Sequence, residues 1–243
     1  MEGEFKAMSE LYKTMPSFVP KPCAWGEFKL PDPRTYFFLC DFIDMSNQLP
    51  EPNQLCARLA ELHRISTAPT GKFGFHVPTC HGRFPQVVNW DSSWATFFSK
   101  LLADVLRLDL EQNGRWKELE DVSERVLTHV IPRLLGVLQA DGRVLKPCLI
   151  HGDLWEGNIG TDFETGEIFI FDSGAYYAHN EMEIGMWRCE RHKIRAKVYT
   201  KQYLRNFGMS EPVEEWDDRN RIYCVKMNMV HSAHHPDSIV RKT

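Results

Sequence analysis

Two short sequences constrain this chain more than any other part of it. HGDLWEGN occupies residues 151–158, and IFIFDSG occupies residues 168–174. The alternating residues of the second sequence predict a strand that follows a glycine-containing turn. That strand would bring Asp172 beside the loop that contains Asp153 and Asn158.

These three polar residues have the types and the spacing that phosphoryl transfer requires. In protein kinases an Asp of the catalytic loop accepts the proton of the acceptor hydroxyl, and an Asn five residues later holds magnesium with a second Asp on the next strand. The pattern therefore predicts Asp153 as the catalytic residue, with Asn158 and Asp172 as ligands of Mg²⁺, which prefers oxygen. Each residue alone would equally suit a turn or a helix cap, but the combination favours the functional interpretation.

The same stretch resembles the fructosamine (ketosamine) kinase family, one of the aminoglycoside-phosphotransferase-like kinases. Trp155 within HGDLWEGN is the most characteristic match. Residues 176–183 and the aromatic-rich residues 73–98 are similar to further motifs of the family. The resemblance extends over about residues 2–201.

The resemblance implies an α+β, protein-kinase-like fold. Residues 1–44 would be a remnant of the small lobe with the hinge, and residues 45–243 a mostly helical large lobe with the catalytic loop and acceptor site. Glu4 would pair the ATP-binding Lys of the family. No sequence upstream of the Glu4 helix supplies that Lys or a glycine-rich phosphate loop, so we expect the chain as written to bind ATP poorly and to turn over little or nothing.

The resemblance also assigns residues to the two ligands. In the hinge, main-chain groups of Asp41, Phe42 and Ile43 would hydrogen-bond adenine. The alternative is that these residues only cap the next element. Substrate binding would fall to Trp155, Trp90, Trp94, His179 and Glu183. Flat aromatic faces pack on sugar rings, but core packing is the alternative for each Trp.

The turn after Asp172 departs from the family. Ser173 and Gly174 stand where the family usually has Pro and Ala, and we expect the Gly to loosen this turn because Gly admits more backbone states.

Composition excludes several classes of protein. The net charge of −4 and the pI near 6.2 argue against a nucleic-acid surface, which needs clustered Lys and Arg. Seven dispersed Cys without a CxxC pair indicate reduced thiols and a cytoplasmic location. The start of the chain does not resemble a signal sequence, and no apolar run predicts a membrane span. A small-molecule or glycated-protein substrate fits better.

Periodicity and breakers predict the remaining elements. Strands are expected at residues 22–30, 36–43 and 144–150, with a turn at residues 31–33. The aromatic-rich residues 73–98 should form a long structured loop that leads into a helix. Helices are expected at residues 4–15, 54–66, 94–110, 116–139, 181–207 and 217–234. We expect an interruption near Pro132 and a solvated basic face at residues 188–197, for which phosphate contact is the alternative.

The sequence thus predicts ATP- and Mg²⁺-dependent phosphorylation of a sugar hydroxyl on a ketosamine, an amine modified by a sugar. Two alternatives remain open. One is a kinase for another small molecule, of the aminoglycoside or choline type. The other is a non-catalytic binding protein, which the missing Lys favours. We also expect self-association through the exposed small-lobe remnant.

Overall fold

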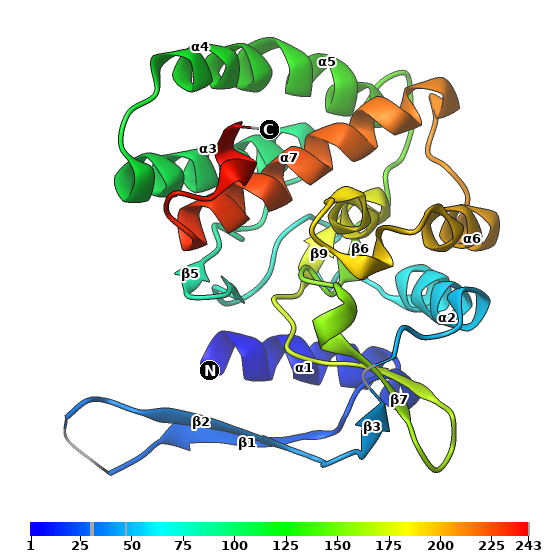
Figure 1. The fold of residues 1–243 in the computed structure, drawn as a ribbon. Helices are drawn as coiled ribbons and strands as arrows, with labels where there is room; N and C mark the ends of the chain where they lie inside the picture. The colour runs from blue at the N-terminus through cyan, green and yellow to red at the C-terminus, as the bar shows by residue number, and fades with distance from the viewer. Residues whose placement is uncertain (30–31, 47, 243) are drawn as a thin grey trace.

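The computed structural model describes residues 1–29, 32–46 and 48–242. Helices form one side of this α+β molecule and a long hairpin crosses the opposite side (Figure 1). Leu30 and Pro31, where the sequence predicts a strand end and a turn, lie outside the described residues. In the described part of the chain, no helix has both the length and the apolar character needed to cross a bilayer.

The predicted N-terminal helix is confirmed as α1 (Glu2–Thr14). Acidic residues lie in its first turn and Lys13 in its last turn, an order that suits the helix dipole. The helix ends before Pro16, as expected. It packs on β1 (Figure 1). Its buried residues are Ala7, Met8 and Leu11.

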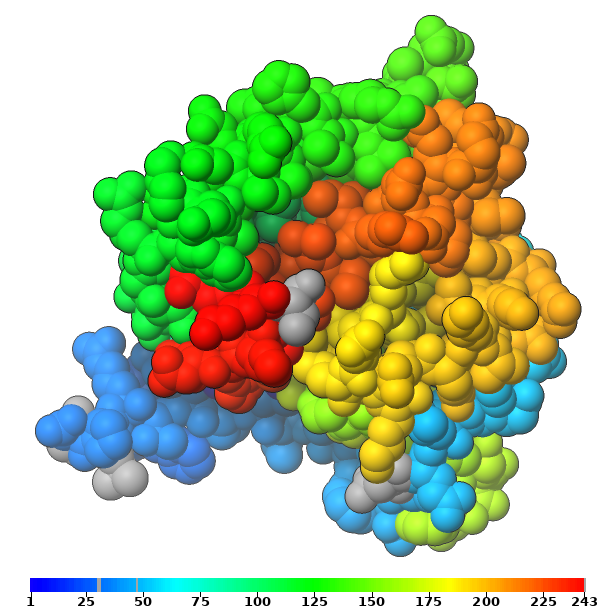
Figure 2. All heavy atoms as spheres, turned by 45° about the horizontal axis from the view of Figure 1, so that its top comes forward, coloured from blue at the N-terminus to red at the C-terminus, as the bar shows by residue number. Residues whose placement is uncertain are grey.

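The next two strands are confirmed, although they are shorter than predicted. β1 (Pro22–Glu27) and β2 (Tyr36–Cys40) pair antiparallel and form a hairpin that projects from the body of the molecule (Figures 1 and 2). Several large apolar side chains of the hairpin and the segment after it are exposed: Phe28, Tyr36, Phe37, Leu39 and Phe42.

A small antiparallel sheet joins this region to the catalytic segment. Its strand order is β3 (Met45–Ser46), β7 (Ile159–Asp162) and β8 (Ile168–Ile170). β7 and β8 form the predicted hairpin. Directly after β8, the Phe171 N–H donates to the Asn158 carbonyl at 3.1 Å, which brings residue 172 back to the catalytic loop.

The helical body follows the predicted pattern. It contains α2 (Pro52–Ile65), α3 (Trp94–Asn113), α4 (Lys117–Arg125), α5 (Ile131–Gly136), α6 (Lys197–Phe207) and α7 (Trp216–His234). The expected interruption is a π-helical segment, Val126–Val130, that leads into α5. Pro132 has no N–H and therefore cannot make the regular bond to the preceding turn. Short 3₁₀ segments complete the chain: Pro16–Phe18, Val137–Gln139, Val213–Glu215 and Ile239–Lys242.

The prediction of one helix at residues 181–207 is wrong. The structure has a 3₁₀ segment η5 (Asn180–Arg188), a 3₁₀ turn η6 (Lys193–Arg195) and then α6. Residues 180–187 are all buried, so tertiary packing overrides helix propensity here. The basic run is not one solvated helix face either, because Arg188 pairs with Asp217 of α7 at 2.6 Å.

The predicted long loop before α3 crosses the molecule beneath the helices. It contains the short hairpin of β4 (Cys80–His81) and β5 (Phe84–Pro85). A bridge between Gly74 and Tyr177 fixes it to β9. The loop is therefore held against the strand that follows the catalytic segment.

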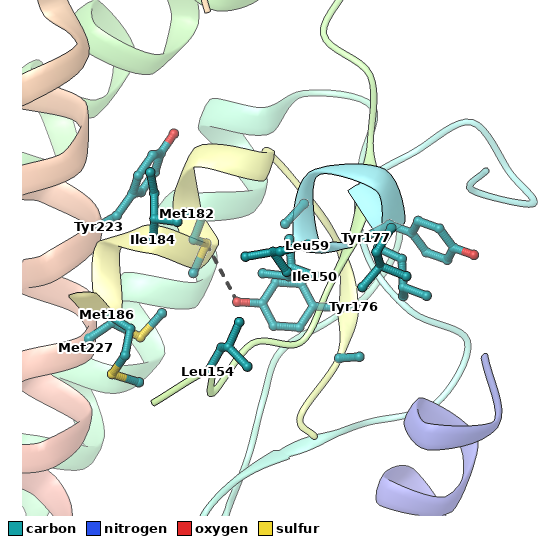
Figure 3. Close-up of a cluster of buried hydrophobic side chains, with 14 of the residues drawn as sticks. Leu59, Ile150, Leu154, Tyr176, Tyr177, Met182, Ile184, Met186, Tyr223 and Met227 are labelled. Atoms are coloured by element: carbon teal, nitrogen blue, oxygen red, sulfur yellow. Dashed lines mark hydrogen bonds between the residues drawn. The ribbon is translucent and has the colours of Figure 1, made fainter. Parts of the chain in front are cut away.

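The core centres on β6 (Cys148–Ile150) and β9 (Tyr176–Ala178), which pair antiparallel. The two Tyr of β9 point to opposite sides, as alternation requires (Figure 3). Tyr176 lies among core side chains with its hydroxyl toward the Met182 sulfur at 3.7 Å. Tyr177 donates to the Glu10 carboxylate of α1 at 2.8 Å, so α1 is fixed to the core that carries the catalytic loop.

Candidate active site

A buried carboxylate holds the start of the catalytic loop. Glu183 of η5 is 1 % exposed and accepts the backbone N–H groups of His151 and Gly152, the latter at 3.0 Å. Its Oε2, which accepts the His151 N–H, also lies 3.6 Å from His63 Nε2 of α2. Gly152 has φ +83°, and a Cβ there would stand 2.8 Å from the Gly174 carbonyl. The loop therefore requires Gly at this position.

His151 fixes the orientation of the catalytic loop through both nitrogens of its ring. Its ring is fully buried, and Nε2 lies 2.9 Å from the Phe171 carbonyl. Since a carbonyl can only accept, Nε2 carries the proton and Nδ1 is free to accept the Asp153 N–H at 3.3 Å. One side chain thus links the loop to the strand that carries Asp172.

Asn158 connects Asp153 and Asp172 through their backbone carbonyls. Its Nδ2 donates to the Asp153 carbonyl at 2.9 Å and to the Asp172 carbonyl at 3.3 Å. It also lies 3.4 Å from Asp153 Oδ2. These contacts occupy the amide nitrogen, so the Asn158 side-chain oxygen can serve as a ligand.

The Asp153 carboxylate is paired on the side away from Asn158. Its Oδ1 lies 3.2 Å from His81 Nε2 of β4, and His81 Nδ1 lies 3.5 Å from Nζ of the buried Lys226 of α7. Burial lowers the pKa of His81. The geometry suits a neutral imidazole that donates to Asp153 and accepts from Lys226.

Burial and neighbouring charges together set the protonation states of Asp153 and Lys226. Burial alone would raise the pKa of Asp153, but its interaction with His81 and the positive charge of Lys226 lower that pKa to about 2. Burial lowers the pKa of Lys226 to about 8, against the opposing attraction of Asp153. At neutral pH, Asp153 is therefore ionised and Lys226 is mostly protonated.

Asp172 lies at the open edge of the site. It is exposed and has φ +58°, a left-handed conformation that Asp tolerates better than most residues. Glu4 of α1 is close enough that burial first, and then the charge of Asp172, raises the pKa of Glu4. The structure thus brings together two carboxylates from distant parts of the sequence, and a cation between them would relieve their repulsion.

The turn after Asp172 is tighter than we expected. Ser173 Oγ donates to the His151 carbonyl at 3.0 Å and accepts the Ala175 N–H at 3.0 Å. A Cβ at Gly174 would lie 2.4 Å from the Cys80 carbonyl. We therefore correct the expectation of a loosened turn, because Gly174 allows close backbone approach instead.

An open cavity of about 380 Å³ lies beside Asp153. Trp155 and Glu156 of the catalytic loop line one side of it. Met186 after β9 and Met227 of α7, which stand next to each other in Figure 3, also line it. The remaining wall is rich in nitrogen-containing side chains: His81, Arg191, His192, His231, His234 and His235.

Of the five residues predicted to bind substrate, Trp155 lines this cavity, and its ring centroid is 5.5 Å from that of His192. Trp90 does not line the cavity; it is half-buried with its ring 6.0 Å from that of Tyr177. Trp94 is fully buried and donates through Nε1 to the Tyr223 hydroxyl at 2.9 Å. For both Trp residues the core-packing alternative therefore holds.

The substrate roles of His179 and Glu183 are also corrected. His179 is fully buried between the Tyr223 hydroxyl and Ser210 Oγ, each at 2.8 Å. Burial lowers its pKa to about 4. Glu183 is occupied by the catalytic-loop amides described above. Neither side chain can reach a ligand in the cavity, and both hold the frame of the site.

The predicted hinge residues lie at the opposite, N-terminal side. The Asp41 N–H already donates to the Lys21 carbonyl at 2.9 Å, so it is not available to adenine in this arrangement. The Phe42 side chain is 91 % exposed. Ile43 is half-buried, just before β3. Their role toward a nucleotide stays a prediction.

Sequence reasoning missed His81, Lys226 and Arg191. Lys226 did leave a signal, because it occupies a buried stripe of α7 between apolar neighbours at helical spacing. A Lys at such a position needs a partner, and here the partners are His81 and Gln86 Oε1, the latter at 3.2 Å. Arg191 belonged to the basic run at residues 188–197, for which we expected a solvated face. His81 carried no comparable signal, since its place depends on tertiary contacts.

Comparison with known proteins agrees with this site. The model of the family "Fructosamine kinase" matches residues 1–241. The chloroplastic protein-ribulosamine 3-kinase of Oryza sativa subsp. indica is 34 % identical over 189 residues, which are 77 % of this chain and 52 % of the relative. The chain thus spans about half the length of this plant relative.

Solved structures show the same fold. A candidate fructosamine-3-kinase from Thermobifida fusca superimposes with a TM-score of 0.76 at 21 % identity, over 99 % of this chain and 76 % of that one. A thermostable mutant of aminoglycoside phosphotransferase APH(4)-Ia, in complex with AMP-PNP and hygromycin B, gives 0.59 at 17 % identity, over 98 % and 82 % of the two chains. The predicted α+β, protein-kinase-like fold is confirmed. The chain belongs to the fructosamine kinase family.

Proposed function

We propose that the protein transfers the γ-phosphoryl group of ATP to a sugar hydroxyl of a ketosamine. The observation that carries this proposal is the geometry of Asp153: an ionised carboxylate at the edge of an open cavity, connected through Asn158 to Asp172. This arrangement supplies an acceptor-orienting group on one side and metal-binding oxygens on the other.

The residues present fit a magnesium ion. The side-chain oxygen of Asn158 and the exposed carboxylate of Asp172 are hard oxygen donors. Two protein ligands would leave other positions for water and phosphate oxygens, the usual arrangement for Mg²⁺. When bound, Mg²⁺ would neutralise phosphate charge. Glu4 is close enough to Asp172 to feel its charge, which supports a position of α1 near the phosphates.

Asp153 would orient the acceptor hydroxyl. In the transfer, a bond forms between the acceptor oxygen and the γ-phosphorus, the bond to the β,γ-bridging oxygen breaks, and ADP leaves. The hydroxyl proton passes to the Asp153 carboxylate and then to solvent. A carboxylate with a pKa of about 2 is a weak base. Because the transition state is loose, alignment of the oxygen matters more than early removal of its proton.

Trp155 would form a face of the acceptor site. Its ring borders the same cavity as Asp153, two residues away in sequence, and flat aromatic surfaces pack against sugar rings. Of the relatives named above, the plant protein is described as a ribulosamine kinase and the Thermobifida fusca protein as a fructosamine kinase. Ribulosamine and fructosamine are both ketosamines. The nucleotide would then lie between the catalytic loop and residues 1–44. The division into a small-lobe remnant, residues 1–44, and a large lobe, residues 45–243, is part of this proposal.

An acceptor panel tests this function. The chain is incubated with ATP and Mg²⁺ and, in parallel, a fructosyl-amine, an aminoglycoside or choline, and both ADP release and acceptor phosphorylation are measured. We expect slow phosphorylation of the fructosyl-amine, in keeping with the weak ATP binding expected of this chain, and none of the other two acceptors. Phosphorylation of the aminoglycoside or choline instead would support another small-molecule kinase, and phosphorylation of no acceptor would support a binding protein.

A further inference from the structure

Arg191 is held in the cavity wall by neutral groups. Its Nη1 donates to Asn228 Oδ1 at 2.5 Å, and its Nη2 donates to the Met227 carbonyl at 3.2 Å. Both acceptors belong to α7, so the guanidinium is fixed against a rigid element. Within residues 1–29, 32–46 and 48–242, no carboxylate lies at ion-pair distance from it. Its charge is therefore not neutralised by the protein.

The carboxylates of the cavity are already committed to other partners. Asp153 is paired with His81 at 3.2 Å. Glu156 accepts the Lys193 N–H at 2.9 Å and lies 3.8 Å from His192 Nδ1. Glu156 thus fixes the segment that carries Arg191 without pairing with Arg191 itself.

Two histidines of the wall, His192 and His231, add no positive charge at neutral pH. Burial first, and then the positive charge of Arg191, lower the pKa values of His192 and His231 to about 4 each. His234 accepts the Arg83 N–H through Nε2 at 3.2 Å and donates through Nδ1 to the Val230 carbonyl at 2.8 Å. Among the described residues that line the cavity, Arg191 is the side chain with a permanent positive charge, and Asp153 lines the same cavity.

We propose that Arg191 anchors a carboxylate on the amine part of the acceptor, so that the protein favours ketosamines formed from amino acids over neutral ketosamines. This inference rests on the proposed function and names the substrate class of the same site. A fixed guanidinium presents parallel N–H donors that match the two oxygens of a carboxylate. A single cation suits a singly charged carboxylate better than a phosphate dianion. The sugar would then lie between Arg191 and Asp153, beside Trp155.

Binding and turnover of two matched acceptors test the inference. The probes are N-fructosylglycine, which ends in a carboxylate, and N-fructosylglycinamide, which has a neutral amide in its place. Calorimetry with the full chain measures their affinities, and phosphorylation assays give kcat and KM for each. We expect the acid to bind about tenfold more tightly than the amide, a difference that lies in KM rather than in kcat.

Three substitutions locate the effect. Arg191→Met should remove the preference for the acid, and Arg191→Lys should retain part of it, since Lys keeps the charge but lacks the planar pair of donors. Arg195→Met is the matched control, because Arg195 is exposed in the neighbouring 3₁₀ turn and does not line this cavity. It should leave the preference unchanged. Thermal unfolding of each variant separates loss of binding from loss of fold.

The outcomes separate this inference from the proposed function. Equal affinities for acid and amide in the wild-type protein, binding of neither probe, or an unchanged preference in a folded Arg191→Met variant would overturn the role of Arg191. Phosphorylation of both probes with the same KM would do so while supporting the proposed function. Preferential binding of the acid without phosphorylation of either probe would overturn the function and leave the anion site standing.

Discussion

The side chains that hold the catalytic loop are buried, whereas those of the N-terminal hairpin are largely exposed to solvent. Beneath the loop, the polar side chains are buried and paired; Glu181, for example, is fully buried and binds Arg219 at 2.7 Å. In the hairpin and the segment after it, large apolar side chains face solvent, and Leu39 is 55 % exposed. The acceptor side of the site is thus preformed by buried contacts, whereas the N-terminal side presents surfaces that the described residues do not cover.

This contrast predicts different consequences of substitution. A change beneath the loop should alter both stability and catalysis, because the same contacts hold the fold and the site. A change at the open edge should alter ligand binding or association and leave the fold intact. The following predictions test this difference.

Glu183→Gln should have the largest effect on stability. The substitution leaves the His151 and Gly152 amides with a weaker acceptor and removes a buried charge, so we expect a loss of about 3 to 5 kcal/mol in the free energy of unfolding. Urea unfolding measures it. Glu190→Gln, at an exposed position, is the control and should cost less than about 0.5 kcal/mol. Equal effects would show that the buried carboxylate does not hold the loop.

The buried His179 should make stability depend on pH. Its folded pKa is about 4, against about 6.5 in the unfolded chain. Between these values the unfolded chain binds a proton that the folded protein excludes. Stability should therefore fall as the pH drops from about 6.5 to about 4, by about 3 kcal/mol for this group.

His179→Gln should flatten this dependence, and unfolding curves across the same pH range measure the change. His129→Gln, at an exposed position of the π-helical segment, is the matched control and should leave the slope unchanged. If both variants keep the wild-type slope, other groups cause the acid sensitivity.

Asp172→Asn should weaken binding of Mg²⁺-ATP by about tenfold, roughly 1.4 kcal/mol, with little change in unfolding. Asn keeps the left-handed backbone that Asp172 adopts and removes the charge. Calorimetry with an ATP analogue compares it with Asp162→Asn, since Asp162 ends β7 and its side chain only accepts N–H groups of the following turn. Similar losses in the two variants would mean that Asp172 has a structural role.

Leu39→Lys should have the smallest effect on the fold. Because the side chain is largely exposed, we expect less than about 0.5 kcal/mol in the free energy of unfolding. If the hairpin mediates the expected self-association, sedimentation should show a larger monomer fraction in this variant. An unchanged distribution of species would exclude this face as the contact.

The sequence predicted the catalytic segment better than the acceptor wall. Asp153, Asn158 and Asp172 lie within one short stretch, so local spacing was sufficient to place them together. Trp94 and His179 share the same family motifs, but their burial depends on α7, which no local pattern reveals. Lys226 approaches Asp153 from α7 as well, across more than seventy residues of chain, and only the folded structure shows that contact.

The most direct test of the account is the rate of phosphoryl transfer from ATP to a fructosyl-amine by the Asp153→Asn variant. Asn keeps the shape of the side chain but removes the charge that orients the acceptor hydroxyl, so the account predicts a rate at least about 100-fold below that of the wild-type protein. Asp162→Asn, at the end of β7, should retain the wild-type rate. An Asp153→Asn variant with most of the wild-type rate would contradict the assignment of this site.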